Sequence, residues 1–241
     1  MLFRRISQHL NDQNWAAVVL DLFIVGFGIF IGLQADAWNV SRQERVMEGK
    51  YLERLLVDMN VSIDMQLQIF DLEKAGIDSI DELARDLAEG TLSEKDRDST
   101  VQALNYLGWV ENPKTRLVTL NELQSSGNIS QIQNSEIRDA LGQLHRSFDD
   151  ATYSAEQTSM LFSSNYELML QSAFLEPSDE EDWGYVSQPD YDYMLSIPHF
   201  GKVVSTYSGW FKYHRTLLQA HHRDTVALRD RVQAELETRF R

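Results

Sequence analysis

The stretch from Trp15 to Trp38, WAAVVLDLFIVGFGIFIGLQADAW, constrains this chain more than any other part of its sequence. Its apolar portion, residues 15–33, contains a single charged residue, Asp21. At ~1.5 Å per residue, a helix over this portion would be roughly 28 Å long, which matches the ~30 Å hydrocarbon core of a bilayer. Tryptophan favours the membrane–water interfaces, and one lies at each end. The sequence therefore predicts one transmembrane helix over residues 15–38, after an amphipathic lead-in over residues 1–14.

A cleaved signal peptide is the alternative interpretation of this segment. Two arginines precede the apolar stretch, and Ala35-Asp36-Ala37 has the A-x-A spacing of a cleavage site. The apolar stretch is nevertheless longer than the ~7–15 residues of a signal peptide's hydrophobic region. No proline or serine-rich turn immediately precedes the alanines. We therefore expect an uncleaved anchor in a lipid bilayer.

The basic residues on the two sides of the span give conflicting signals about its orientation. Arg4 and Arg5 precede it, whereas a larger group of basic residues follows it between positions 42 and 54. By number alone, the later group would place the C-terminal side in the cytoplasm. Glutamates are interleaved with that group, however, at spacings that allow i, i+4 pairs on a helix. We therefore expect a bacterial inner-membrane protein with its body in the periplasm, a compartment that the absence of cysteine also suits.

One side of the predicted span carries small and acidic residues. Gly28 and Gly32 are one helical turn apart, in the G-x-x-x-G spacing that lets a second helix approach closely. Asp21 and Asp36 fall roughly on the same side, and carboxylates are costly in lipid unless they meet a partner or water. The alternative is that the glycines are incidental and the aspartates reach the headgroups. We expect a helix-association face that serves a homo-oligomer or another membrane-protein subunit.

The rest of the chain, residues 39–241, is predicted to be all-α. From residue 40 to about residue 87, apolar residues recur at spacings of three and four, which marks one helical face. No proline separates this segment from the span, so the membrane helix should continue into the body, with a candidate bend at Gly76 and an end at Gly90. Proline and glycine are scarce in the whole chain (4 and 12), which favours long helices over sandwiches or barrels.

Capping signals divide the middle of the chain into shorter helices. Ser93, with acidic residues in the turn that follows, predicts a helix start, and that helix should stop at Gly108. Thr119 and Glu122 have the spacing of a capping box, and Gly127 suits the position after a helix end. The Ser-Ser-Gly at 125–127 is therefore interpreted as a helix exit, since no nearby base would activate a serine nucleophile. Asn134 should cap a helix that extends to about residue 173.

Residues 176–192, EPSDEEDWGYVSQPDYD, change the character of the chain. Prolines and acidic residues concentrate here, which predicts a solvated acidic loop. The acidity could also hold Ca²⁺, but the segment lacks the D-x-D-x-D-G order of an EF-hand. We expect a connector and no metal site.

The last helix has a strict seven-residue repeat. Two rows recur at that interval and together predict coiled-coil-like packing: Val204, Phe211, Leu218, Thr225 and Val232, and Tyr207, His214, His221 and Leu228. The second row places His214 and His221 on the apolar stripe. They are either a pH-responsive pair or polar residues at the edge of the core. Because they are two turns apart, about 10.5 Å along the axis, they cannot bind one metal without ligands from another helix.

Two groups of motifs add a family resemblance. The first combines the apolar span with Ile31-Gly32-Leu33-Gln34, Trp38-Asn39 and Arg42-Gln43-Glu44-Arg45; the second is LNELQSSGNI, residues 120–129, followed by Ile137-Arg138-Asp139-Ala140-Leu141. In this combination the chain resembles a widespread bacterial family of uncharacterised single-pass membrane proteins, a domain of unknown function. The resemblance implies an N-terminal anchor with a helical body, and no catalytic residue can be carried over from it.

Composition narrows the possible functions further. A net charge of −15 opposes phosphate backbones, so nucleic acid is not an expected partner. Without cysteine there is no disulfide or thiol chemistry, and the histidines and carboxylates match no metal or acid–base spacing. We expect no enzyme and no cofactor. The leading hypothesis is a membrane-anchored structural or interaction protein, either self-associating or an accessory subunit. The alternative is a sensory or ligand-binding domain with a pocket lined by aromatic residues such as Trp109, Tyr153 or Trp210.

Overall fold

The computed structural model describes residues 15–176 and 185–240, and most of these residues are helical. The all-α prediction therefore holds. The lead-in expected over residues 1–14 lies outside the described residues. The chain divides into two compact units, residues 1–50 and 51–241, and each is described here by itself.

In the first unit, the structure confirms a helix over the apolar stretch. Helix α2 (Trp15–Glu89) contains all of it. By length and composition, this helix is able to cross a membrane, and its most apolar 18-residue window is 0% buried. The rings of Phe23 and Phe27, one turn apart, stack along it with centroids 6.1 Å apart. Anchoring in a membrane itself remains a prediction, because a signal sequence or the core helix of a soluble protein also passes this test of length and composition.

Helix α2 continues to Glu89 as the sequence predicts, since it contains no proline to interrupt its hydrogen bonds. It ends where Gly90 takes a positive φ of 68°, a conformation that glycine adopts without steric cost. A bend at Gly76 remains a prediction; what the structure shows at this glycine is close packing. A Cβ at Gly76 would lie 2.3 Å from the ring of Tyr106, so only glycine lets that ring rest on the helix backbone.

The second unit contains the remaining elements. They are η1 (Glu94–Asp96), α3 (Arg97–Leu107), α4 (Val118–Ser125), η2 (Asn128–Gln131), α5 (Ser135–Ser164), α6 (Tyr166–Gln171), β1 (Ala173–Glu176), β2 (Tyr185–Pro189), α7 (Tyr191–Ser196) and α8 (Phe200–Arg239). Three predicted ends are confirmed. The Ser93 amide donates to Asp96 Oδ2 at 3.2 Å, Gly127 after α4 has a φ of 71°, and Asn134 Oδ1 accepts from the Glu136 amide at 2.9 Å.

The capping box predicted for Thr119 and Glu122 is wrong. Helix α4 begins earlier, with Leu117 as its N-cap residue. The Thr119 amide donates instead to Asp58 Oδ2 of α2 at 2.9 Å. The Glu122 carboxylate pairs with Arg54, also of α2, whose Nη1 donates to Oε1 at 3.1 Å. The start of α4 is thus capped by a carboxylate from another helix, a contact that no local spacing reveals.

The predicted loop over residues 176–192 is also partly wrong. Strands β1 and β2 pair antiparallel, with Ala173 opposite Pro189 and an irregularity between Phe174 and Leu175, and α7 begins at Tyr191. Residues 177–184 lie outside the described residues. The helix expected to reach residue 173 ends at Ser164 and is followed by α6. The strands are too short for their alternation to be recognised, and each depends on a partner more than eight residues away.

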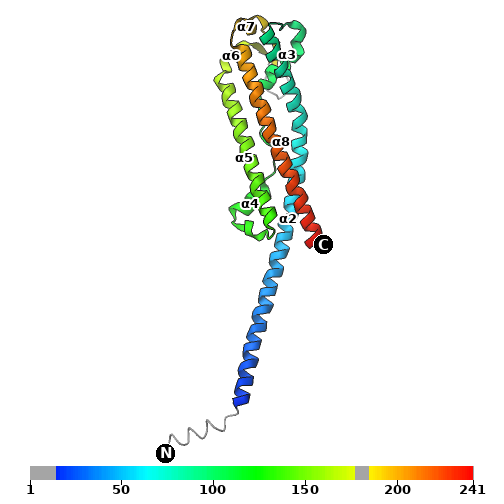
Figure 1. Ribbon diagram of the computed structural model, residues 1–241, viewed down its shortest axis with the longest axis vertical. Helices are drawn as coiled ribbons and strands as arrows, with labels where there is room; N and C mark the ends of the chain where they lie inside the picture. The colour runs from blue at the N-terminus through cyan, green and yellow to red at the C-terminus, as the bar shows by residue number, and fades with distance from the viewer. Residues whose placement is uncertain (1–14, 177–184, 241) are drawn as a thin grey trace, which may run out of the picture. The chain divides into compact units, whose positions relative to one another are not determined.

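Two apolar clusters form the core of the second unit. The first joins the start of this unit's part of α2, including Leu52 and Leu55, to α4, the first half of α5 and the end of α8. The second joins the end of α2, including Ile80, to α3, α7 and the start of α8. Helices α5 and α8 lie side by side, with residues 51–89 of α2 along them (Figure 1). All nine positions of the two seven-residue rows on α8 are buried, as their spacing predicts.

Candidate functional site

A layer of buried polar side chains separates the two apolar clusters. We call it the polar layer; it consists of the buried residues Ser62, Gln66 and Glu73 on α2, Ser147, Ser154 and Thr158 on α5, and His214, His221 and Thr225 on α8, together with the half-buried Thr115 before α4. On each long helix these positions lie between the residues that contribute to one apolar cluster and those that contribute to the other. Along the helices, the interior of the second unit therefore has one apolar cluster toward each end and the polar layer between them.

His221 lies at the centre of this layer and uses both ring nitrogens. Its Nε2 is 2.6 Å from Thr115 Oγ1, and its Nδ1 is 2.9 Å from Ser147 Oγ. The ring of Phe148 stands edge-on at 5.8 Å between centroids. Burial lowers the pKa of His221 to about 4, so the imidazole is neutral near pH 7. It serves as a neutral connector between α8, α5 and the segment before α4.

Gln66 extends the network to α2. Its Nε2 lies 3.2 Å from Thr115 Oγ1 and 3.3 Å from Thr225 Oγ1. Its Oε1 lies 2.9 Å from Nδ1 of His222. A buried amide satisfied in this way fixes one register between α2 and α8, because a shift of either helix would leave polar atoms unpaired.

His214 is buried separately from His221. Its Nε2 lies 2.8 Å from the Glu111 carbonyl oxygen, whereas its Nδ1 is buried with no hydrogen-bond partner among the described residues. Burial lowers its pKa. The structure therefore places both predicted histidines in the interior, but with different partners. A pH response of the two remains a prediction.

A cavity of about 410 Å³ opens beside the polar layer, between α2, α3 and the segment that follows α3. Its lining includes Glu73, Gly76, Asn105, Tyr106, Trp109 and Glu111. Glu73 is only 1% exposed, and its Oε2 has no hydrogen-bond partner among the described residues. Burial raises the pKa of Glu73 to about 7; the positive charge of Arg215 opposes this rise and the negative charge of Glu111 adds to it. The cavity thus contains a carboxyl group that titrates near neutrality.

Two other groups of the cavity wall, the Glu111 carboxylate and the Tyr106 ring, have partners. The Glu111 carboxylate accepts from Trp109 Nε1 at 2.9 Å and pairs with Lys114 Nζ at 3.2 Å. Tyr106 packs on Gly76, and its ring centroid is 5.1 Å from that of Phe211. Burial raises the pKa of the Tyr106 hydroxyl. Among the described residues that line the cavity, Glu73 is the one with a buried oxygen that has no hydrogen-bond partner.

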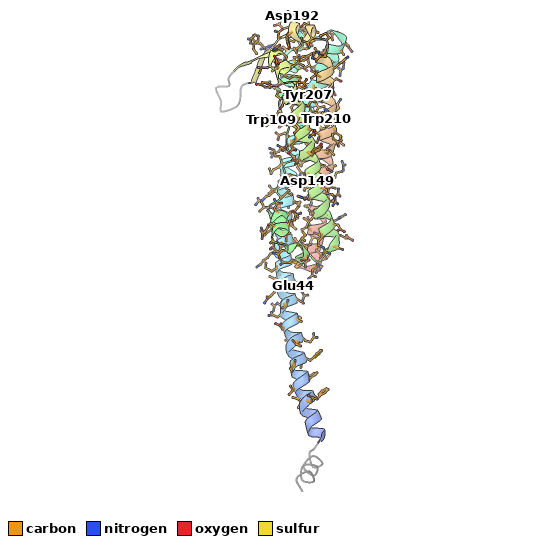
Figure 2. All side chains as sticks on the ribbon, turned by 90° about the vertical axis from the view of Figure 1, so that its left-hand side faces the viewer. Glu44, Trp109, Asp149, Asp192, Tyr207 and Trp210 are labelled. Atoms are coloured by element: carbon orange, nitrogen blue, oxygen red, sulfur yellow. The ribbon has the colours of Figure 1, made fainter. Side chains whose placement is uncertain are left out.

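Of the three aromatic residues expected to line a pocket, only Trp109 lines this cavity. Tyr153 is exposed on α5. Trp210 lies on α8, with its ring edge-on to that of Tyr213 and 6.0 Å between the ring centroids. Figure 2 labels Trp109 and Trp210. The sequence prediction missed Glu73. A sequence signal for its inward position nevertheless exists, because Glu73 belongs to a seven-residue repeat along α2. The repeat consists of Met59, Gln66, Glu73 and Ile80.

The predicted association face lies in the first unit. A Cβ built at Gly28 or Gly32 would meet no atom within 4 Å, so the backbone is accessible at both positions. Asp36 is exposed. Asp21 is part of α2, but its side chain lies outside the described part of the structure. Association through this face remains a prediction.

No family model, curated protein or solved structure matches this chain. The family resemblance drawn from the motifs therefore remains a prediction, and the functional argument depends on the geometry. Within residues 15–176 and 185–240, no three or more His, Asp or Glu side chains are grouped so that they could hold a metal ion.

Proposed function

We propose that this chain is a membrane-anchored interaction protein of the bacterial inner membrane, with its body in the periplasm. The observation that carries the proposal is the uncovered apolar surface of the first unit. Leu22, Phe23 and Leu33 are 73%, 68% and 66% exposed, and the residues between them are similarly uncovered. Soluble monomers rarely expose apolar patches larger than a few hundred Å². A lipid bilayer is the environment in which such a helix is stable.

The anchor would associate through its glycine face. In lipid, helices gain little from the hydrophobic effect, and close backbone contact through small residues supplies the attraction instead. Gly28 and Gly32 leave the backbone open on one side of α2. A second copy of this helix, or a helix of a larger complex for which this chain is an accessory subunit, would fit there.

The body would be a helical bundle with coiled-coil-like packing. The seven-residue rows of α8 and the buried amide and imidazole groups between α2, α5 and α8 support this geometry. A bundle whose register is fixed by polar contacts is suited to hold an interaction surface at a constant position.

The test is the oligomeric state of the full chain in detergent and its cross-linked neighbours in native membranes. Gly28→Ile with Gly32→Ile should abolish association. Gly26→Ile is the matched control, because Gly26 is equally open but lies on another side of the helix. A wild-type chain that is monomeric and cross-links to no other protein would contradict the proposal.

Orientation is tested separately by protease treatment of spheroplasts. If the body is periplasmic, the protease should digest it in intact spheroplasts. Digestion only after lysis would place the body in the cytoplasm and reject that part of the proposal.

A ligand-binding body is the second candidate, and the cavity beside Glu73 is the observation that favours it. Its volume of about 410 Å³ is within the ~300–1,000 Å³ range of small-molecule sites. A ligand that binds only the folded chain would raise its melting temperature.

A further inference from the structure

The cavity contains a buried carboxyl group, that of Glu73, with an oxygen that lacks a hydrogen-bond donor among the described residues. Glu73 Oε2 is buried without a hydrogen-bond donor among the described residues, and the side chain is 1% exposed. An isolated buried carboxylate is unfavourable, and a cationic donor that reaches it would form a charge-assisted hydrogen bond. Arg215 influences Glu73 through its charge but donates no hydrogen bond to Oε2. The described residues therefore supply no donor to this oxygen, and a molecule that enters the cavity would be such a donor.

The cavity wall also has an aromatic and apolar part. Trp109 and Tyr106 line it together with Leu72 and Ala75. The faces of indole and phenol rings attract cations, and their area favours an organic group over a hydrated ion. Trp109 is 58% exposed, so its ring stands at the rim, where an entering molecule would meet it.

We propose that this cavity binds a small organic amine in its protonated form. Its ammonium group donates to Glu73 Oε2, and its apolar body lies against Trp109 and Leu72. This inference rests on the second candidate function, a ligand-binding body, and is independent of any association through the anchor.

A hard metal ion fits the lining less well than an amine does. Ca²⁺ takes about six to eight oxygen ligands. The cavity contributes two carboxylates, and that of Glu111 already accepts from Trp109 and pairs with Lys114. A single free carboxylate oxygen beside aromatic rings matches one ammonium group.

The charged groups around Glu73 predict how binding depends on pH. Arg215 faces it from α8, Tyr106 from α3 and Glu111 from the segment after α3, where His214 contacts the Glu111 carbonyl. A bound cation favours the ionised form of Glu73, whose pKa is about 7 in the empty cavity. An amine with a pKa like that of lysine, about 10, stays protonated. Its affinity should therefore rise from pH 6 to pH 8, and binding at pH 6 should release a proton.

Titration calorimetry and tryptophan fluorescence on the full chain in detergent test this proposal. Benzylamine is the probe, and benzyl alcohol is its neutral counterpart of nearly the same shape. Benzylamine should bind saturably with a Kd of about 1 mM or tighter, and benzyl alcohol at least about tenfold more weakly. Equal affinity for the two probes, or no saturable binding of benzylamine, would overturn the proposal.

Three variants locate the site. Glu73→Gln should weaken benzylamine binding about tenfold or more and remove its pH dependence. Glu53→Gln makes the same change at an exposed position of α2 and should bind as the wild type does. Trp109→Ala removes a ring that is 58% exposed, and should also weaken binding. Melting curves confirm that each variant is folded; unchanged binding by Glu73→Gln would overturn the proposal.

The two hypotheses fail in different ways. If benzyl alcohol stabilises the chain as much as benzylamine does, the body binds a ligand but the ligand is not selected as an amine. If neither probe raises the melting temperature while the anchor still associates, the amine site is rejected and the interaction function remains.

Discussion

His221 Nε2 lies 2.6 Å from Thr115 Oγ1, and this contact joins the last helix to the segment that precedes α4. The two residues are 106 positions apart in the chain. Thr115 lies outside the helices, whereas His221 belongs to a seven-residue row of α8, and neither position indicates the other as its partner. Their contact nevertheless lies at the centre of the polar layer, so several consequences of the structure can be tested through it.

Thr115→Val should destabilise the chain by ~1–3 kcal/mol. The substitution keeps the shape of the side chain but leaves His221 Nε2 and Gln66 Nε2 without this partner. Urea unfolding measures the effect. Thr216→Val is the control, because Thr216 is exposed on α8 and should change stability by less than about 0.5 kcal/mol. Equal effects of the two variants would show that the polar layer contributes little.

Glu73→Gln should stabilise the chain at pH 8 and have little effect at pH 4.5. The pKa of Glu73 is raised in the folded state to about 7, whereas its ordinary value is 4.5. The folded chain therefore binds more protons than the unfolded chain between these values, and stability is lost as the pH rises through this window. Removing the titrating group should recover about 1–3 kcal/mol at pH 8. Urea unfolding at the two pH values gives the comparison, and a gain that is independent of pH would contradict it.

His221 should produce the opposite pH dependence. Its pKa is lowered to about 4 in the folded state from an ordinary value of 6.5, so the unfolded chain binds more protons in this range. Stability should then fall as the pH falls from 6.5 to 4, by up to about 3 kcal/mol. Because Glu73 masks this trend in the wild type, Glu73→Gln is the background in which to measure it. Stability that rises on acidification in that variant would contradict the burial of a neutral imidazole.

Gly76→Ala should destabilise the chain although alanine favours helices. Its Cβ would lie 2.3 Å from the Tyr106 ring, and displacing that ring also disturbs its contact with Phe211. We expect a loss of about 1–3 kcal/mol, as for other overpacked positions. Gly209→Ala is the matched control on α8, where a Cβ meets no atom within 4 Å. There the helix propensity alone should give a gain of up to about 1 kcal/mol, and thermal melts of the two variants should shift in opposite directions.

The helix boundaries that follow from nearby residues could be predicted from the sequence. Ser93, Gly127 and Asn134 act through contacts within one turn of their own position, so their spacing is sufficient. Thr119 shows the limit of this approach. Its amide donates to Asp58, 61 residues earlier, because tertiary packing brings that carboxylate to the amide and pairs the Glu122 carboxylate with Arg54.

The candidate site could be predicted only in part. The seven-residue rows correctly place His214 and His221 in the interior, since a residue's face on a helix depends only on its periodicity. The rows do not show which atoms meet there. Trp109 was recognised as an aromatic candidate, whereas Glu73 was overlooked because a glutamate at an inward position resembles any charged helical residue.

By itself, the sequence determined the apolar helix, its continuation through residue 89 and the all-α character of the body. These features depend on hydrogen bonds and side-chain spacing within a few residues of each other. Only the tertiary structure decided that the interior is divided by a polar layer, that residues 173–176 and 185–189 pair as strands, and that a carboxyl group is buried beside a cavity. These features arise from contacts between groups that are from nine to more than a hundred residues apart, and local periodicity cannot specify the partners of such contacts.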